Sequence, residues 1–309
     1  MEVCRGLERL LRQPDSVLTV GTFDGVHLGH QFIIDGVLNE AAKLGSLSTL
    51  VTFEPHPRSI IDGAEFAPKV LTTLDEKLEI FEHLRVQRVV VIEFTRAFSQ
   101  TPSEFFVQEI LFRQVGFRKI MVGYDHGFGK DRQGSLKTLR DARTQLGFEV
   151  EELPEFQLHD QPVKSTAIRQ MLEEGQVDGA AESLGRTYRL SGTVVHGAGR
   201  GRNIGYPTAN ITPLSRTKLV PGSGVYAVRV HVGGEARGGM MNIGVRPTFG
   251  LQEQTIEVHI FDFKQDVYGE VLNIDLVKRV RPEMKFESSS HLETQLSHDK
   301  ENVLQILNQ

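Results

Sequence analysis

The chain has 309 residues, a formal net charge of −5 and one cysteine, Cys4. One cysteine excludes an internal disulfide and a cysteine-based metal cluster. The nearly balanced charge lacks the concentrated basic face of nucleic-acid binders, and no apolar stretch is long enough to span a bilayer, so we expect neither nucleic acid nor a membrane as a partner. The first residues also lack the apolar block of a signal peptide, which predicts a cytoplasmic protein.

The first half of the chain alternates apolar strand patterns with helical patterns. This alternation predicts an α/β domain in which a parallel sheet carries helices on both faces. Ligands of such sheets bind at the carboxyl ends of the strands, and the unusual residues of this half follow directly after predicted strands. The expected strands are 17–20, 47–53, 86–94, 118–124 and 148–153.

The most informative segment, residues 21–30, reads GTFDGVHLGH and follows the first strand. Apolar residues at helical spacing begin after it, so His27 and His30 lie where a strand turns into a helix. A helix start offers unpaired N–H groups and a positive dipole end, and glycines let a polyphosphate approach the main chain. Imidazoles there can donate hydrogen bonds to charge that builds on a phosphoryl group. A glycine-rich turn with polar histidines is the alternative.

Two further segments follow strands of this half. In the run EPHPR, His56 and Arg58 could face a phosphate or a ring, although a rigid turn with solvated charges is the alternative. In the run GYDHGFGK, residues 123–130, Phe128 offers a surface on which a planar ring can stack.

A fourth segment, KSTAIR, begins a helix expected over residues 166–174. Ser165 is a candidate N-cap of this helix. Hydroxyl and N–H groups at a helix start suit a β- or γ-phosphate, and Arg169 adds a charged donor.

Beyond residue 184 the pattern changes to period two without intervening helices, which predicts a small antiparallel barrel. We therefore place the domain boundary there, with domains 1–184 and 185–309. The expected strands are 188–195, 224–232, 235–243, 255–263 and 271–280, with a hairpin turn at Gly233-Gly234. A closing helix is expected from 289 to 307, with barrel contacts from Leu292, Leu296, Val303, Leu304 and Leu307.

The strongest motif of the second half is GRGRNIGYPTAN, residues 199–210. Its glycines form a loop that can fold over a nucleotide. The Thr208 hydroxyl and the Asn210 amide oxygen suit Mg²⁺, which takes few protein ligands beside waters and phosphates. The alternative is a hydrogen-bonded turn.

Glu257 lies within a predicted strand, on the face opposite Ile256 and Val258. A solvent-facing carboxylate on an amphipathic strand is the ordinary interpretation, and the residues alone leave it open.

The first-half segments, in this order, resemble the FMN adenylyltransferase module of bacterial bifunctional riboflavin kinase/FAD synthetases, a Rossmann-like nucleotidyltransferase domain. The resemblance implies that His27 and His30 are catalytic and stabilise the α-phosphate of ATP while pyrophosphate leaves. It implies that the flavin or nucleotide contacts His56, Asp125 and Phe128. It implies an ATP site of Gly21, Phe23, Asp24, Gly25, His27, His30, Ser165, Thr166 and Arg169. Lys164 and Gly127 depart from the family pattern.

The second half resembles riboflavin kinase, a six-stranded antiparallel barrel with a terminal helix. The resemblance implies that Glu257 is the catalytic base for the ribityl hydroxyl and that Thr208 and Asn210 hold Mg²⁺. It implies kinase ATP contacts at Gly199, Arg202, Gly205, Pro207, Thr208 and Asn210, and flavin contacts at Tyr226, Asn242 and Arg246.

The resemblance predicts a cytoplasmic transferase that uses ATP and Mg²⁺ to convert riboflavin to FMN and FMN to FAD. One alternative is a monofunctional riboflavin kinase, against which the intact His27, His30 and Arg169 argue. A second is a flavin-binding regulator without catalysis, which would not need Glu257, Thr208 or Asn210. A third is a different acceptor for the first domain. The sequence leaves the oligomeric state open, a homo-oligomer included.

Overall fold

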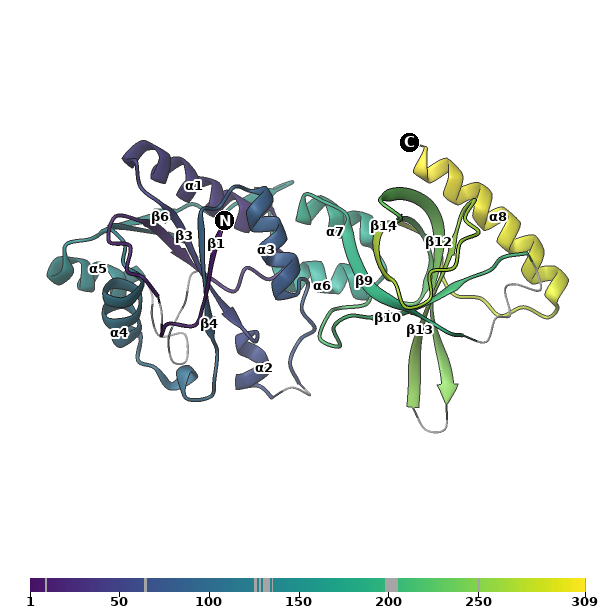
Figure 1. Cartoon of the computed structure of the whole chain (residues 1–309), viewed down its shortest axis with the longest axis horizontal. Helices are drawn as coiled ribbons and strands as arrows, with labels where there is room; N and C mark the ends of the chain where they lie inside the picture. The colour runs from purple at the N-terminus through teal and green to yellow at the C-terminus, as the bar shows by residue number, and fades with distance from the viewer. Residues whose placement is uncertain are drawn as a thin grey trace. The chain divides into compact units, whose positions relative to one another are not determined.

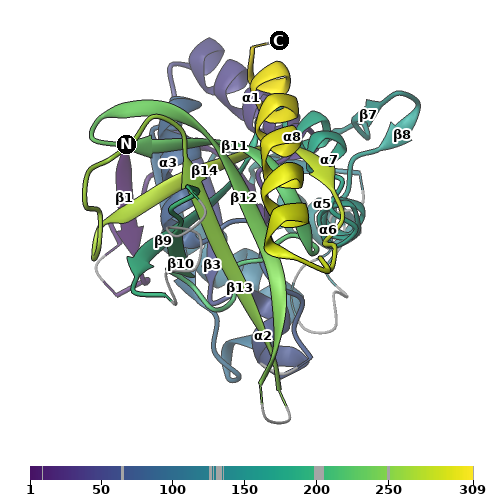
Figure 2. The same ribbon diagram turned by 90° about the vertical axis from the view of Figure 1, so that its right-hand side faces the viewer.

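The computed structural model describes residues 1–8, 10–63, 66–124, 127, 129, 134, 136–197, 205–248 and 251–308, with the side chains of 246–248 and 251–253 excepted. Its contacts divide into two compact units, Met1–Ser165 and Thr166–Gln309. Figures 1 and 2 show the elements from two sides. Among these residues, no helix is both long and apolar enough to cross a membrane.

The first unit is built on a six-stranded sheet in which every pairing is parallel, as predicted. The strand order is β1-β4-β3-β2-β5-β6. One strand was not predicted, because the short edge strand β1 is mostly exposed and lacks a continuous apolar run. The strands are β1 (Glu2–Arg5), β2 (Val17–Val20), β3 (Ser48–Glu54), β4 (Arg88–Glu93), β5 (Lys119–Gly123) and β6 (Glu149–Leu153).

The order of this sheet reverses beside β2. From β2 the chain adds β3 and then β4 on one side, and it adds β5 and β6 on the other. In open parallel sheets, the carboxyl ends of the strands at such a reversal form the crevice where ligands bind. The segment that follows β2 is the one that carries His27 and His30.

Helices cover both faces of this sheet (Figure 1). Alternate residues of β2 reach opposite sides, because Val17 packs in one buried cluster and Leu18 in the other. The first cluster includes residues of α1 and α3, and the second includes residues of the π-helix η2 and of α5. The helices are α1 (Leu28–Leu44), α2 (Pro57–Ile61), α3 (Leu74–His83), the 3-10 turn η1 (Phe98–Gln100), α4 (Ser103–Phe105), η2 (Phe106–Val115) and α5 (Leu136–Leu146). A small hairpin, β7 (Gln157–Leu158) and β8 (Gln161–Pro162), follows β6.

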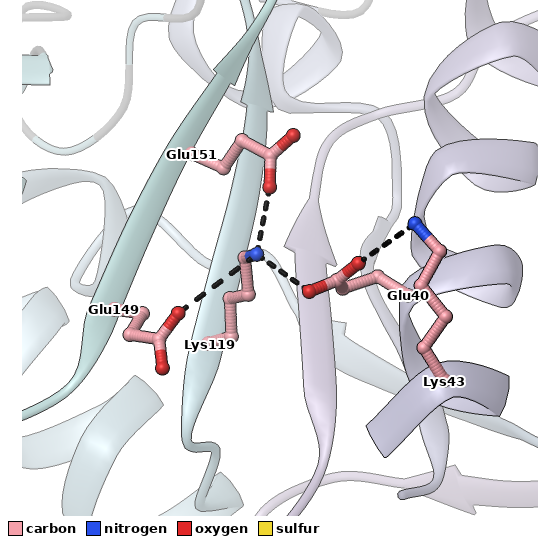
Figure 3. A network of polar contacts seen from close by, with 5 residues as sticks. All are labelled: Glu40, Lys43, Lys119, Glu149 and Glu151. Atoms are coloured by element: carbon pink, nitrogen blue, oxygen red, sulfur yellow. Dashed lines mark hydrogen bonds and ion pairs between the residues drawn. The ribbon is translucent and has the colours of Figure 1, made fainter. Parts of the chain in front are cut away.

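A charged network ties α1 to the starts of β5 and β6 (Figure 3). The Lys119 ammonium lies 2.7 Å from a carboxylate oxygen of Glu40 and 2.7 Å from one of Glu151. Burial disfavours the charge of Lys119, but the bonds to the two carboxylates outweigh it and raise the pKa of this lysine. The hydrogen bond from Lys119 lowers the pKa of Glu40. The network lies near the amino ends of these strands. The histidine segment, in contrast, follows the carboxyl end of β2.

The second unit is a closed antiparallel barrel of order β10-β13-β12-β11-β14-β9 with a terminal helix, as the resemblance implied. The turn at Gly233-Gly234 joins β11 to β12, as predicted. One strand, β10, was not predicted, because its residues were interpreted as loop and turn. The elements are α6 (Ser165–Glu173), α7 (Val177–Leu184), β9 (Tyr188–Val195), β10 (Ala209–Pro213), β11 (Gly224–Val232), β12 (Glu235–Thr248), β13 (Leu251–Ile260), β14 (Val271–Arg281) and α8 (Ser289–Leu307).

Helices α6 and α7 group with the barrel, whereas the sequence placed them in the first domain. The Gly222 N–H donates to the Leu172 carbonyl at 2.9 Å, and the Arg279 guanidinium donates to the Glu174 carbonyl at 3.0 Å. These bonds join the end of α6 to the barrel. The contacts therefore divide the chain about twenty residues before the predicted boundary.

Helix α8 begins and ends where the sequence predicted and lies across the outside of β11, β12 and β14 (Figure 2). Val303 and Leu307 are buried against Val225 and Met240 of the barrel. Leu304 was expected to pack there as well, but it is 40% exposed. The face instead includes Asp299, which is fully buried and bonded to Arg281 of β14 at 2.8 Å. The sequence pattern identified only apolar contacts on this face, so it did not predict the buried pair of Asp299 and Arg281.

Candidate active sites

The two motif histidines of the first unit lie together at the start of α1. His27 is the N-cap residue of this helix, and its Nδ1 accepts a hydrogen bond from the His30 N–H at 3.3 Å. The two imidazole rings stack, with centroids 3.7 Å apart and an interplanar angle of 17°. The structure therefore brings both imidazoles to the positive end of a helix dipole.

The segment before these histidines, residues 21–27, has an unusual backbone and is called the histidine loop below. Phe23 and Val26 have positive φ angles of 48° and 37°, which non-glycine residues seldom adopt. Both side chains are buried in the core of the unit. The Phe23 ring lies edge-on to the His30 ring, with centroids 5.4 Å apart.

A second chain segment holds the histidine loop. Asp24 Oδ1 accepts hydrogen bonds from the Leu71 and Thr72 N–H groups at 2.9 and 3.2 Å. In return, the Gly25 N–H donates to Thr72 Oγ1 at 3.0 Å. Phe23 and Asp24 were expected to contact ATP, but each is only 2% exposed and engaged within the protein. In this structure they support the loop.

Lys77 of α3 also reaches the histidine loop. Its ammonium donates to the Thr22 carbonyl at 3.0 Å, and the side chain is buried. Burial lowers the pKa of Lys77, whereas the charges of Asp24 and Glu54 oppose that shift. Sequence reasoning did not single out Thr72 or Lys77, because nothing in their local pattern reveals a contact with a loop some fifty residues earlier.

The other residues predicted for this site lie on different elements and not all in the first unit. Ser165 begins α6, and its hydroxyl donates to the Asp24 carbonyl at 2.9 Å rather than capping the helix. His56 caps α2, accepting from the Arg58 N–H at 3.2 Å. Thr166 and Arg169 lie on α6 and belong to the second unit. Asp125 and Phe128 lie outside the described residues.

A row of polar residues crosses three strands of the barrel. Asn210 of β10 lies opposite Glu257 of β13, which in turn lies opposite Asn242 of β12. We call Asn210, Glu257 and Asn242 the polar row. Asn242 lies opposite Val225, which packs against α8, so the row lies on the outer face of the barrel. The Thr208 hydroxyl donates to Glu257 Oε2 at 3.3 Å.

Two glycines, Gly197 and Gly244, lie close to the polar row. A Cβ at Gly197 would lie 2.1 Å from the amide nitrogen of Asn210, and one at Gly244 would lie 2.5 Å from a carboxylate oxygen of Glu283. A side chain at either position would therefore displace Asn210 or Glu283 from its present place. Glu283, which sequence reasoning did not assign, lies near Asn242 as a second carboxylate beside the row.

His259, two residues after Glu257, fastens the PTAN segment to β13. Its Nδ1 bonds to the Pro207 carbonyl at 2.8 Å, and its ring lies edge-on to Tyr206. Burial lowers the pKa of His259, although the bond to the Pro207 carbonyl acts in the opposite direction.

Some predicted kinase residues do not join the polar row. Tyr226 is fully buried and its hydroxyl donates to the Gly222 carbonyl, so the structure gives it an internal contact instead of an exposed flavin surface. Gly205 has a φ of 79°, which glycine tolerates. Gly199 and Arg202 lie outside the described residues, as does the side chain of Arg246.

Comparisons with known proteins match both units. The family model for FAD synthetase matches residues 11–167, and the model for riboflavin kinase matches residues 184–307. The chain belongs to the bifunctional riboflavin kinase/FMN adenylyltransferase family. The Haemophilus influenzae member is 37% identical over all of both chains, and the Bacillus subtilis member is 38% identical over 94% of this chain and 92% of its own.

The solved structures include a close match in fold. A Streptococcus pneumoniae protein described as a macrolide-efflux protein superposes with a TM-score of 0.88 at 30% identity. The match covers 97% of this chain and 98% of that one. The two-unit architecture of this family member is thus found in a solved structure over nearly its full length.

Proposed function

We propose that the chain makes FMN and then FAD, each at its own site. In the second unit, the ribityl hydroxyl oxygen of riboflavin attacks the γ-phosphorus of ATP, and ADP leaves. In the first unit, a phosphate oxygen of FMN attacks the α-phosphorus of ATP, and pyrophosphate leaves. The proposal rests on one observation. Each unit matches a different transferase family and holds its own polar side chains, the stacked His27 and His30 in the first unit and the bonded Thr208 and Glu257 in the second.

At the first site, His27 and His30 act on the α-phosphate. Their stacked imidazoles lie at a helix N-terminus, where N–H groups and the dipole favour a polyphosphate. Hydrogen bonds to the charge that develops on the phosphoryl oxygens stabilise the transition state. Ser165, Thr166 and Arg169 are proposed to bind the β- and γ-phosphates, and His56, Asp125 and Phe128 to contact the flavin or nucleotide.

At the second site, Glu257 accepts the proton of the attacking hydroxyl. The Thr208 hydroxyl, 3.3 Å from Glu257, and the Asn210 amide on the neighbouring strand supply oxygen ligands of the kind that Mg²⁺ prefers. These residues fit the ion, which when bound would neutralise phosphate charge. The contact of Glu257 with Thr208 and its pairing with Asn210 support this assignment of the base and the metal ligands.

We also propose a cellular location and the class of partner. The near-neutral charge and the small phosphorylated substrates support a cytoplasmic enzyme that needs no nucleic acid.

The test is a paired assay on one preparation of each variant, riboflavin to FMN and supplied FMN to FAD. His30→Ala should slow FAD formation about a hundredfold, the effect of one lost donor to phosphoryl charge, and leave FMN formation intact. Glu257→Gln should slow FMN formation about a hundredfold to ten-thousandfold and leave FAD formation intact.

Each variant is the control for the other, since the untouched activity reports the amount of intact chain, and the melting curve of each variant reports folding of the mutated unit. Equal loss of both activities in His30→Ala would show that the histidines do not serve adenylyl transfer alone. Unchanged riboflavin phosphorylation in Glu257→Gln would return this carboxylate to an ordinary surface role.

A further inference from the structure

Three residues outside the histidine motif hold the histidine loop in place. Leu71 and Thr72 donate their N–H groups to Asp24, Thr72 accepts from the Gly25 N–H, and Lys77 donates to the Thr22 carbonyl. We call Leu71, Thr72 and Lys77 the loop clamp. Its bonds reach three residues of the loop, Thr22, Asp24 and Gly25, from a segment that begins 47 residues after Asp24.

The loop needs such support because its backbone is not one that the sequence adopts by itself. Phe23 and Val26 have positive φ angles, and such conformations persist only where surrounding contacts determine them. Val26 immediately precedes His27, the N-cap residue of α1. A shift of the loop would therefore turn the His27 ring, which is stacked on His30.

The contacts of the clamp with the loop are separate from the cap of α3. Thr73, the next residue, caps α3 in a capping box with Glu76, with hydrogen bonds of 3.3 and 2.8 Å. Thr72 is 5% exposed and Lys77 is 3% exposed, so neither side chain is available to a ligand. Both act on the loop and not on the substrate.

We propose that Thr72 and Lys77 are positioning residues of adenylyl transfer, which fix the histidine loop so that His27 and His30 face the α-phosphate. The proposal rests on the proposed function of the two histidines. It assigns to the start of α3 a part in the chemistry that occurs at the start of α1.

The test uses the full chain and measures kcat and KM for conversion of supplied FMN to FAD. Thr72→Val keeps the shape of the side chain but removes the acceptor for the Gly25 N–H. We expect kcat to fall about tenfold, the effect of one hydrogen bond, with KM for ATP and for FMN within about twofold of the wild type. Thr72→Ser retains the acceptor and should restore kcat.

The matched control is Thr73→Ala, which removes the α3 cap one residue away but no contact with the loop. It should lower the melting temperature at least as much as Thr72→Val while keeping the wild-type kcat. Lys77→Met, which removes the bond to the Thr22 carbonyl, should lower kcat as Thr72→Val does. Riboflavin phosphorylation in each preparation measures the amount of folded second unit, and the melting curve of each variant shows whether the first unit is folded.

Wild-type kcat in both Thr72→Val and Lys77→Met, or an equal fall in Thr73→Ala, would overturn the proposal. His30→Ala in the same series distinguishes the proposed role of the histidines from the proposed role of the clamp. If His30→Ala slows FAD formation about a hundredfold while the clamp variants keep the wild-type kcat, only the positioning role is wrong. If His30→Ala keeps FAD formation, the role of the histidines is wrong and the clamp proposal falls with it.

Discussion

At the scale of single residues, His259 holds a segment of the proposed kinase site in place without being assigned any of its chemistry. Its bond to the Pro207 carbonyl holds the residue before Thr208 against β13. Thr208 in turn reaches Glu257. The neutral ring is what the buried position favours, since burial lowers the pKa of His259.

This burial makes the stability of the second unit depend on pH. The folded state binds fewer protons at His259 than the unfolded state, so its contribution is complete above the ordinary histidine pKa of about 6.5 and is lost as the pH falls through the lower folded pKa. We expect His259→Gln, whose amide can still donate to Pro207, to weaken the fall in melting temperature between about pH 7 and pH 5. Melting curves at each pH measure it, with His298→Gln on the exposed face of α8 as control. An unchanged slope in His259→Gln would contradict the assignment.

At the same scale, the sequence predicted that His27 and His30 lie at a helix start, but it did not predict the residues that support them. His27 and His30 come together at the predicted helix start, and Thr208 contacts Glu257. Phe23, Asp24 and Tyr226 were expected to face ligands, but the structure buries them. A motif shows that a residue type is required at a position, whereas its direction depends on backbone angles that single-sequence patterns do not contain.

At the scale of elements, one buried ion pair joins α8 to the barrel. Asp299 is fully buried and accepts three hydrogen bonds from the Arg281 guanidinium and one from Gln295. Removal of one partner leaves a buried charge without compensation, which costs far more than an exposed pair would.

We therefore expect Asp299→Ala to lower the free energy of unfolding of the second unit by about 3–5 kcal/mol. Denaturant unfolding followed by circular dichroism measures this loss. Glu301→Ala, on an exposed position of the same helix, is the control and should change stability by less than about 0.5 kcal/mol. A loss in Asp299→Ala no larger than that of the control would mean that α8 is held by its apolar residues alone.

The elements that the sequence missed are those without periodicity. The strand β1 has four residues with mostly exposed side chains, and β10 has five residues and begins inside the motif that was interpreted as a turn. Such short strands are formed by their neighbours, since β1 pairs with β4, and β10 pairs with β9 and β13. In contrast, the 19 residues of α8 contain enough turns for the pattern to fix both ends.

At the scale of the whole molecule, the division into two units bears on how the chain can be cut. A piece with residues 185–309 retains Thr208, Asn210 and Glu257, but it lacks α6 and α7. It loses the Leu172 and Glu174 carbonyls that accept bonds from the barrel, together with the buried side chains of α7. A piece that begins at residue 166 keeps them.

We expect both pieces to make FMN, and the longer piece to be more stable by on the order of 4 kcal/mol, the value of burying the apolar side chains of α7. Thermal melting of the two purified pieces, with riboflavin phosphorylation measured below both transitions, is the comparison. Equal melting temperatures would show that α6 and α7 contribute nothing to the barrel. A longer piece that folds but makes no FMN would contradict the modular assignment.

The strand β10 closes the barrel, but it pairs over fewer residues with one neighbouring strand than with the other. It pairs with β9 at four positions but with β13 at only two, and one of those two is the Asn210 and Glu257 pair. A junction with so few rungs is where amide hydrogens should exchange first, because local opening costs least where the ladder is shortest. Any ligand held jointly by Asn210 and Glu257 stabilises the closed junction by mass action. Ligand binding at the proposed kinase site and local opening of the barrel wall are thus linked in one equilibrium.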